Sequence, residues 1–205
     1  MRRIAGDNLS YASTVGGVPV YELAAIFMLA HPQGAPNVMS SYGFDRASAA
    51  GRDAGPPSAA GGVTLSTFNG AGTSLCSATL GSAQVGSWIC EHRRDAIANM
   101  VAFRRATVGA SLVGFQIVNG DNNRIAFARD GKGFVALGRS GATSFVAATT
   151  LPNGSYCNVA QYRYTAAGGA TPASCSGPAI GVAAGSATIN LPANGAVVLH
   201  LGAAL

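Results

Sequence analysis

Arg124-Ile125-Ala126-Phe127-Ala128, then Asp130-Gly131, then Gly133-Phe134-Val135-Ala136-Leu137 is the stretch that decides the fold. Each outer run is short, apolar and rich in residues that favour strands. The Asp-Gly pair between them suits the tight turn of a hairpin, because glycine tolerates the left-handed backbone that such a turn needs. The stretch therefore predicts two antiparallel strands over 124–128 and 133–137.

Further strand-like runs follow this hairpin towards the end of the chain. The turn signals between them include Pro152-Asn153-Gly154 and Pro192-Ala193-Asn194-Gly195. The predicted strands cover 144–149, 155–161, 179–183, 186–191 and 196–201. About seven strands in roughly ninety residues is the rhythm of an antiparallel sandwich. Residues 109–205 are therefore expected to form an all-β domain.

The part before residue 109 carries helical patterns instead. A first helix is predicted over 18–31, with Pro19 in its first turn and Pro32 ending it. The residues spaced to line its buried face are Tyr21, Ala24, Ala25 and Met28. A short strand is expected over 38–42, followed by a long loop over 43–87 that is rich in Gly, Ser and Ala.

A second helix is predicted over 88–105. Ile97, Met100 and Val101 are expected on its buried side, and Glu91 is placed in the first turn, where an acid favours the helix dipole. Residues 1–108 thus form a helix, strand and helix region distinct from the β-domain. We expect residues 1–105 to be less stable than 112–201.

Composition limits the classes of partner. Of the 205 residues, 48% are apolar and 10% are charged, and the formal net charge is +5. The basic residues are scattered pairs such as Arg93-Arg94 and Arg104-Arg105, without the clustered footprint that phosphate binding needs. The first apolar run, 20–30, carries Glu22 and is too short to span a bilayer. We therefore expect neither a nucleic-acid nor a membrane partner.

Four cysteines, Cys76, Cys90, Cys157 and Cys175, lack the short spacing and the neighbouring histidines of a zinc site. Two disulfides in an oxidising compartment fit them better. Three connectivities exist, and the spacing favours the one that pairs neighbours and keeps each bridge within one half of the chain. The cysteines predict an extracellular protein, yet no signal peptide is visible, so we expect the N-terminal part to have been lost.

Several blocks of the sequence resemble the α-amylases of glycoside hydrolase family 13. They are Phe27-Met28-Leu29-Ala30-His31-Pro32, Val38-Met39-Ser40-Ser41-Tyr42, Gly55-Pro56-Pro57, Trp88-Ile89-Cys90-Glu91-His92-Arg93 and Leu151-Pro152-Asn153-Gly154-Ser155-Tyr156-Cys157. The blocks stand in the family's order, and the resemblance covers nearly all of residues 8–205.

This resemblance implies an α+β fold: a partial (β/α)8-barrel remnant followed by an antiparallel Greek-key β-sandwich domain. Residues 18–42 would correspond to the barrel's seventh helix and eighth strand, and 93–105 to its last helix. It also implies the disulfides Cys76–Cys90 and Cys157–Cys175. The parental activity is endo-hydrolysis of α-1,4-glucan, with calcium and chloride as cofactors.

The residues that cleave the glycosidic bond are expected outside this chain. A retaining glycosidase needs two carboxylates that flank the scissile bond. In the family these acids, a supporting Asp and the calcium ligands all lie upstream of residue 1. We therefore assign no catalytic residue and no metal ligand, and expect a truncated α-amylase that is inactive alone. Its partners would be starch, the missing barrel portion or a second copy.

Two rival interpretations stay open. The first is a non-catalytic module whose β-domain binds starch or stabilises a partner chain. The second is a stand-alone enzyme that assembles a site across a homodimer, which would require Asp45 and Asp53 from the long loop, the least explained acids. Loss of activity in Asp45→Asn or Asp53→Asn would favour the second.

A few residues have sharper candidate roles. Arg46 stands four residues after Tyr42, where chloride-dependent members of the family carry a chloride-binding arginine; a solvated loop arginine is the alternative. Tyr162 and Tyr164 are the better candidates for sugar stacking, because Trp88 and Phe115 are expected to pack in the core. The histidines His31, His92 and His200 are expected to be structural.

Overall fold

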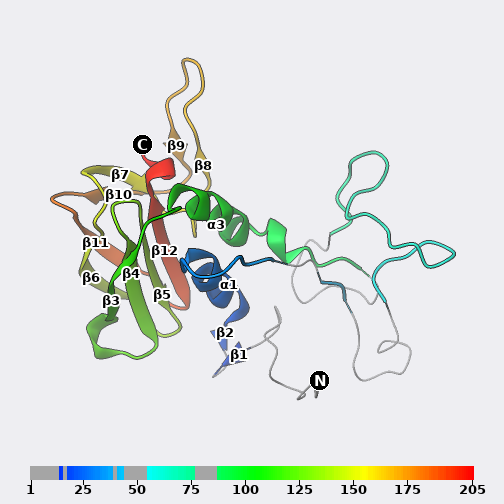
Figure 1. Cartoon of the computed structure of the whole chain (residues 1–205), viewed down its shortest axis with the longest axis horizontal. Helices are drawn as coiled ribbons and strands as arrows, with labels where there is room; N and C mark the ends of the chain where they lie inside the picture. Colours follow the sequence, from blue (N-terminus) through cyan, green and yellow to red (C-terminus); the bar gives the residue numbers. More distant parts are fainter. Residues whose placement is uncertain (1–13, 16–17, 39–40, 44–54, 77–86) are drawn as a thin grey trace. The chain divides into compact units, whose positions relative to one another are not determined.

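The computed structural model describes residues 14–15, 18–38, 41–43, 55–76 and 87–205. It divides into two compact units, and each is described by itself. The first comprises the described residues of 13–36 and 95–205, and the second those of 37–94. Figure 1 labels the helices and strands.

A four-stranded antiparallel sheet lies at the centre of the first unit. Its strand order is β12-β5-β4-β3. The strands are β3 (Leu112–Ile117), β4 (Arg124–Arg129), β5 (Gly133–Gly138) and β12 (Gly195–His200). The hairpin predicted from Asp130-Gly131 is confirmed: β4 pairs with β5, and Gly131 has a φ of 67°.

The six strands between β5 and β12 form three antiparallel pairs. The pairs are β6 (Thr143–Ala148) with β11 (Ser186–Leu191), β7 (Gly154–Cys157) with β10 (Ala179–Val182), and β8 (Tyr164–Thr165) with β9 (Ser174–Cys175). The strand predicted over 155–161 is too long, since β7 ends at Cys157 and a turn follows.

The core lies between the four-stranded sheet and this second layer. It is built from alternate residues of β4, β5, β12 and the facing strands: Ala126, Ala128, Phe134, Ala136, Val197 and Leu199 against Ala147, Tyr156, Val182, Ala187, Ile189 and Leu191. All six residues of β5 are buried. A strand buried on both faces explains why Gly133–Leu137 reads as a continuous apolar run instead of an alternating one.

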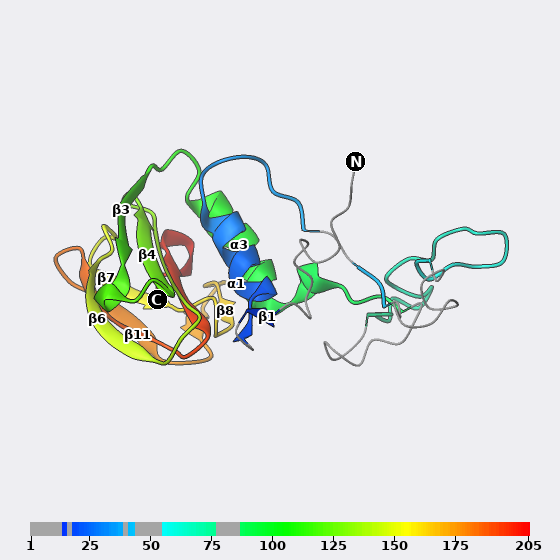
Figure 2. The ribbon, with the colours of Figure 1, turned by 90° about the horizontal axis from the view of Figure 1, so that it is seen from below.

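Two helices cover the other face of the four-stranded sheet, α1 (Tyr21–Ala30) and α3 (Asp95–Ala106). Figures 1 and 2 show the pair side by side on one side of the sheet. Phe27 of α1 meets Phe127 of β4 edge to face at 6.0 Å between ring centroids. Helices of 10 and 12 residues are marginal alone, so this packing stabilises them.

The first predicted helix is present, but its predicted start at residue 18 is wrong. Val18–Pro19 forms β2, which pairs with β1 (Thr14–Val15), and α1 begins only at Tyr21. Its buried residues are Ala25, Ile26, Leu29 and Ala30, while Met28 is 38% exposed. The buried face is therefore rotated from the predicted one.

The second helix also begins later than predicted. Cys90 has a left-handed backbone with a φ of 57°, Glu91–Arg93 forms the short 3-10 helix η1, and Arg94 is extended. Glu91 therefore precedes α3, and Asp95 occupies its first turn. The core side of α3 includes Ile97, Met100 and Phe103, whereas Val101 is 53% exposed.

Strand β3 was not predicted. It is the edge strand of the central sheet, and its pairing with β4 is irregular between Val113 and Gln116, next to Gly114 with a φ of 62°. Phe115 is 57% exposed, so its predicted place in the core is wrong. An irregular edge strand that faces water lacks the clear alternation of apolar and polar residues by which a strand is recognised in a sequence.

The short 3-10 helix η2 (Val118–Gly120) follows β3, and the short 3-10 helix η3 (Leu201–Ala203) follows β12.

The second unit consists mainly of turns. Residues 57–65 and 67–75 form two successive hairpin turns with the same hydrogen-bond pattern, closed by Leu65 N to Pro57 O and by Leu75 N to Thr67 O. Of the strand predicted over 38–42, residues 39 and 40 lie outside the described part. Tyr42 forms one antiparallel bridge with Trp88.

Candidate functional site

Arg129 joins the ends of both helices to the central sheet. It is the last residue of β4 and only 4% exposed. Its guanidinium donates to Ala30 O at 2.8 Å, Thr107 O at 2.9 Å and Ala110 O at 2.8 Å and 3.1 Å. Ala30 ends α1 and Thr107 follows α3, so one side chain satisfies carbonyl groups that helix ends leave unpaired.

The charge of Arg129 suits this place. The C-terminal end of a helix carries a partial negative charge, which a buried cation complements. Burial lowers the pKa of Arg129 below the ordinary arginine value, and the nearby charge of Arg104 lowers it further. A guanidinium stays protonated in proteins, so the side chain remains a five-donor fork.

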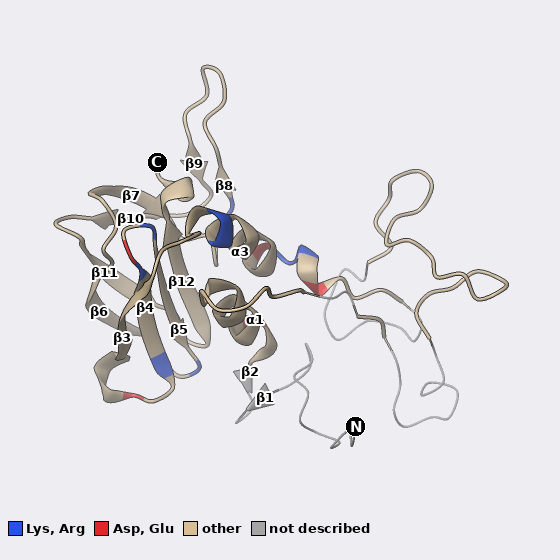
Figure 3. Ribbon diagram, viewed as in Figure 1, with Lys and Arg blue, Asp and Glu red and all other residues tan. Residues whose placement is uncertain are grey.

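Arg104 holds the segment that leaves α1. Its guanidinium donates to Leu29 O at 3.2 Å, His31 O at 2.8 Å and Gly34 O at 2.5 Å. The end of α1 therefore receives one arginine from α3 and one from β4. Figure 3 shows the basic last turn of α3 in blue. We call Arg104 and Arg129, with the carbonyls they bind, the arginine anchor.

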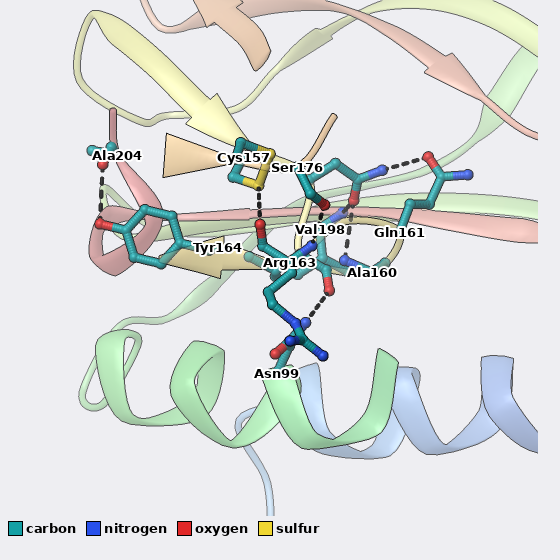
Figure 4. Close-up of a disulfide and its surroundings, with 12 residues drawn as sticks. Asn99, Cys157, Ala160, Gln161, Arg163, Tyr164, Ser176, Val198 and Ala204 are labelled. Atoms are coloured by element: carbon teal, nitrogen blue, oxygen red, sulfur yellow. Dashed lines mark hydrogen bonds between the residues drawn. A yellow bond between two sulfur atoms is a disulfide. The ribbon is translucent and has the colours of Figure 1, made fainter. Parts of the chain in front are cut away.

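A second anchor joins the start of α3 to the turn after β7 (Figure 4). Asn99 Nδ2 donates to Val159 O at 2.8 Å. The buried Asn158 fixes this turn: its Oδ1 accepts from Val198 N at 2.9 Å, and its Nδ2 donates to Gln161 Oε1 at 2.8 Å. A buried amide with both ends paired orders its surroundings.

The disulfides have the expected pairing. Cys157–Cys175 lies in the first unit and closes the loop that carries this turn, as Figure 4 shows. Cys76–Cys90 lies in the second unit. The implied connectivity is therefore confirmed, and it agrees with an oxidising compartment.

The two tyrosines proposed for sugar stacking are half-buried in separate contacts. Tyr164 donates its hydroxyl to Ala204 O at 3.2 Å. The ring of Tyr162 lies against Gly177, where an added Cβ would come within 2.3 Å of it. The sugar-binding role of either ring stays a prediction.

A cleft of about 310 Å³ lies between the start of α1 and two turns of the β-domain. Its polar lining is Glu22, Gln161 and Asn194, and its apolar wall includes Leu23, Ile26 and Pro192. Gln161 comes from the turn that Asn158 orders. A carboxylate and two carboxamides over an apolar wall suit a small hydroxyl-rich ligand.

His200 lies at the interface of β12 and α3. It is 3% exposed, and its ring meets Phe103 edge to face at 5.9 Å. Within the described residues its Nδ1 has no hydrogen-bond partner. Burial lowers the pKa of His200 to about 4, so the ring is neutral near pH 7. The expectation that His200 is structural fits this packing.

The second unit is organised around Glu91, which is 3% exposed. Its carboxylate accepts from the backbone NH of Ser41 at 2.8 Å and from the Ser41 hydroxyl. Nearby, the guanidinium of Arg93 lies 4.5 Å above the ring of Phe68. These contacts order turns, and within the described residues the recorded partner of the Glu91 carboxylate is Ser41.

The remaining candidates lie only partly within the described residues. Arg46, Asp45 and Asp53 lie outside the described residues. Asp121 binds Asn123 and Ser140, and the hydrogen bond from the backbone NH of Asn123, followed by that from Ser140, lowers the pKa of its carboxyl group. Across the described part of the chain, no three His, Cys, Asp or Glu side chains are grouped to hold a metal ion.

The roles of Arg129, Asn99 and Asn158 were not predicted. The available signal was a charged residue at each end of an otherwise apolar strand, Arg124–Arg129. The partners of Arg129 are backbone carbonyls up to 99 residues away in the sequence, and no side-chain motif reveals them.

Residues 115–202 match the family model described as the α-amylase C-terminal all-β domain. The chain is 40% identical to an α-amylase of Thermomonospora curvata over 183 residues, covering 88% of this chain and 26% of that protein. It is 38% identical to an α-amylase of Tribolium castaneum over 190 residues, covering 90% of this chain and 34% of that one.

Solved structures of α-amylases are also similar to this chain. One match is a complex of an α-amylase I variant from Eisenia fetida with maltohexaose, with a TM-score of 0.66 and 30% identity, covering 88% of this chain and 35% of that one. The wild-type Eisenia enzyme gives a TM-score of 0.63 at 28% identity. The chain thus spans about a third or less of the length of these relatives. Its residues 115–202 thus belong to the α-amylase C-terminal all-β domain family, and the chain as a whole is similar to the C-terminal region of α-amylases.

Proposed function

We propose that this chain serves as the structural C-terminal region of an enzyme that hydrolyses internal α-1,4-glucan bonds with retention. In this proposal α1 and α3 are the last two helices of a (β/α)8 barrel, residues 1–108 belong to that barrel, and 109–205 form the β-domain. The β-domain holds the barrel's last helices in position. The α-amylase relatives, one of them solved with maltohexaose, support an α-glucan as substrate of the parent enzyme.

The observation that carries the proposal is the arginine anchor. Arg129 of the sheet binds carbonyls at the ends of both helices, and Arg104 of α3 binds the end of α1. Burying a charged side chain is costly unless its donors are paired, so a sheet that buries Arg129 favours the helices in one position. This is the arrangement expected of a domain that supports the end of a larger helical layer.

The chemistry and the cofactors belong to the rest of the parent enzyme. In our proposal the catalytic carboxylates and the calcium ligands lie in the part of the family that precedes this match. Arg46 remains the candidate chloride ligand. The paired cysteines support secretion, and no helix within the described residues is long and apolar enough to cross a membrane.

Reducing-sugar release from soluble starch tests this assignment. The purified chain, supplied with calcium and chloride, is expected to release no reducing sugar. Release that disappears in Asp45→Asn or Asp53→Asn would contradict the proposal and would favour a site in the 43–87 loop.

Starch binding by the β-domain is a second candidate function, favoured by the cleft of about 310 Å³ at Glu22, Gln161 and Asn194. The measurement is retention of the chain on insoluble starch. Retention that Gln161→Ala weakens, and that the exposed control Gln116→Ala leaves unchanged, would support this function. Equal retention of all three proteins, or none, would exclude the cleft as the binding site.

A further inference from the structure

An exposed acceptor triplet opens strand β7. Asn153-Gly154-Ser155 has the form Asn-X-Ser, in which X is not proline, and such triplets accept N-linked glycans on secreted proteins. All three residues are exposed. Other exposed Asn-Gly turns lack the hydroxyl two positions on: Asn69-Gly70-Ala71, Asn119-Gly120-Asp121 and Asn194-Gly195-Ala196.

The side chain of Asn153 is held by its oxygen end. Oδ1 accepts a hydrogen bond of 2.7 Å from the backbone NH of Ala184. Nδ2, the atom that carries a glycan, makes no hydrogen bond with the described residues. The two ends of a planar amide point in different directions, so a sugar on Nδ2 leaves the Ala184 contact in place.

The surroundings leave room for a glycan. Ser155 pairs with Gly181 of β10, and an added Cβ at Gly181 would meet nothing within 4 Å. In Figures 1 and 2, β7 lies on the side of the central sheet away from α1. A glycan on Asn153 would therefore not touch the helices that the arginine anchor fixes.

We propose that Asn153 is an N-glycosylation site, used when the chain enters a secretory compartment that holds an oligosaccharyltransferase. The donor is a lipid-linked oligosaccharide diphosphate. The bond between Nδ2 and the sugar C1 forms, the bond between C1 and the diphosphate oxygen breaks, the lipid diphosphate leaves, and Nδ2 gives up one proton. The inference rests on secretion and is independent of any hydrolytic activity.

The test is secretion of the full chain from yeast behind a host signal sequence, followed by intact-mass measurement before and after peptide N-glycosidase. All test proteins carry Asn8→Gln, which removes the other triplet, Asn8-Leu9-Ser10, outside the described residues. The expected result is a glycan mass that the glycosidase removes. It is lost in Asn153→Gln and Ser155→Ala, and kept in Ser155→Thr and Asn194→Gln.

Ser155→Ala guards against misfolding, because it removes only an exposed hydroxyl and keeps the hydrogen bond between Asn153 and Ala184. The proposal is overturned if the secreted, disulfide-bonded protein carries no glycan in both the Asn8→Gln parent and Ser155→Thr. It is also overturned if the glycan persists in Asn153→Gln.

Discussion

Arg129 Nη1 donates a hydrogen bond of 2.8 Å to Ala30 O, which joins the last residue of β4 to the last residue of α1 across 99 positions of sequence. The same guanidinium binds the carbonyls of Thr107 and Ala110 after α3. A single buried side chain of the sheet thus binds the ends of both helices. This relationship is the basis of the structural role proposed for the β-domain.

Replacement of Arg129 should cost more stability than replacement of an exposed arginine. Arg129→Met leaves buried carbonyl groups without donors, so we expect the free energy of unfolding to fall by about 3 kcal/mol. Arg139→Met, at an exposed position, should change it by less than about 0.5 kcal/mol. Urea unfolding followed by circular dichroism gives both values. Equal, small effects would show that the anchor contributes little.

Much of the β-domain could be predicted from sequence, because its strands are short apolar runs separated by Gly, Pro and Asn turns. Strand β3 could not, since Phe115 and Ile117 face water and Gly114 interrupts the pairing. The start of α3 was misplaced because the left-handed backbone at Cys90 depends on tertiary structure, including its bridge to Cys76.

The site was less predictable than the fold. The disulfide pairing was favoured by the cysteine spacing and implied by the family resemblance, whereas the partners of Arg104 and Arg129 are carbonyl oxygens brought close only by folding. A backbone acceptor has no signature in sequence. Arg46 lies outside the described residues, so its chloride-binding role stays a prediction.

The close packing of α3 on the sheet leads to a second prediction, about Gly133. A Cβ added at Gly133 of β5 would come within 2.7 Å of the Phe103 ring and 2.8 Å of Thr107 Cγ2. Gly133→Ala should therefore lower the free energy of unfolding by about 1–3 kcal/mol. Gly181→Ala, in a strand where the added Cβ meets nothing within 4 Å, is the matched control. Thermal unfolding of both variants decides the point, and an unaffected Gly133→Ala protein would argue against this contact.

His200 should make the fold sensitive to mild acid. Its pKa is lowered from 6.5 to about 4 in the folded protein, so the unfolded chain takes up the proton first as the pH falls below 6.5. The stability is full above pH 6.5 and decreases by up to about 3 kcal/mol as the pH approaches 4.

Urea midpoints measured across this pH range test the effect of His200. In His200→Gln the dependence should flatten, whereas His31→Gln, at a half-buried position, should keep it. The lowered pKa of Asp121 acts in a separate window, because its contribution is present above the ordinary value of 3.8 and is lost below it. A pH dependence unchanged by His200→Gln would rule out this origin.

The exposed turns of the second unit should be cut before the helices. Leu65 and Phe68 are each 42% exposed in segments with few buried contacts, so brief chymotrypsin treatment should cleave there first. The fragment bearing α1 should then stay with the β-domain in gel filtration, because the arginine anchor holds it without a covalent bond. Early separation of the two fragments would contradict this, as would cleavage in α3 before the turns.

The most direct test of the account is the activity of a chimera in which this chain replaces the matching C-terminal region of the Thermomonospora curvata α-amylase. Starch hydrolysis would be measured for the chimera, for its Arg129→Met and Arg139→Met variants, and for the chain alone. We expect an active chimera whose thermal inactivation is accelerated by Arg129→Met and unchanged by Arg139→Met, and no hydrolysis by the chain alone. A folded but inactive chimera, or hydrolysis by the chain alone, would contradict the structural role proposed for this region.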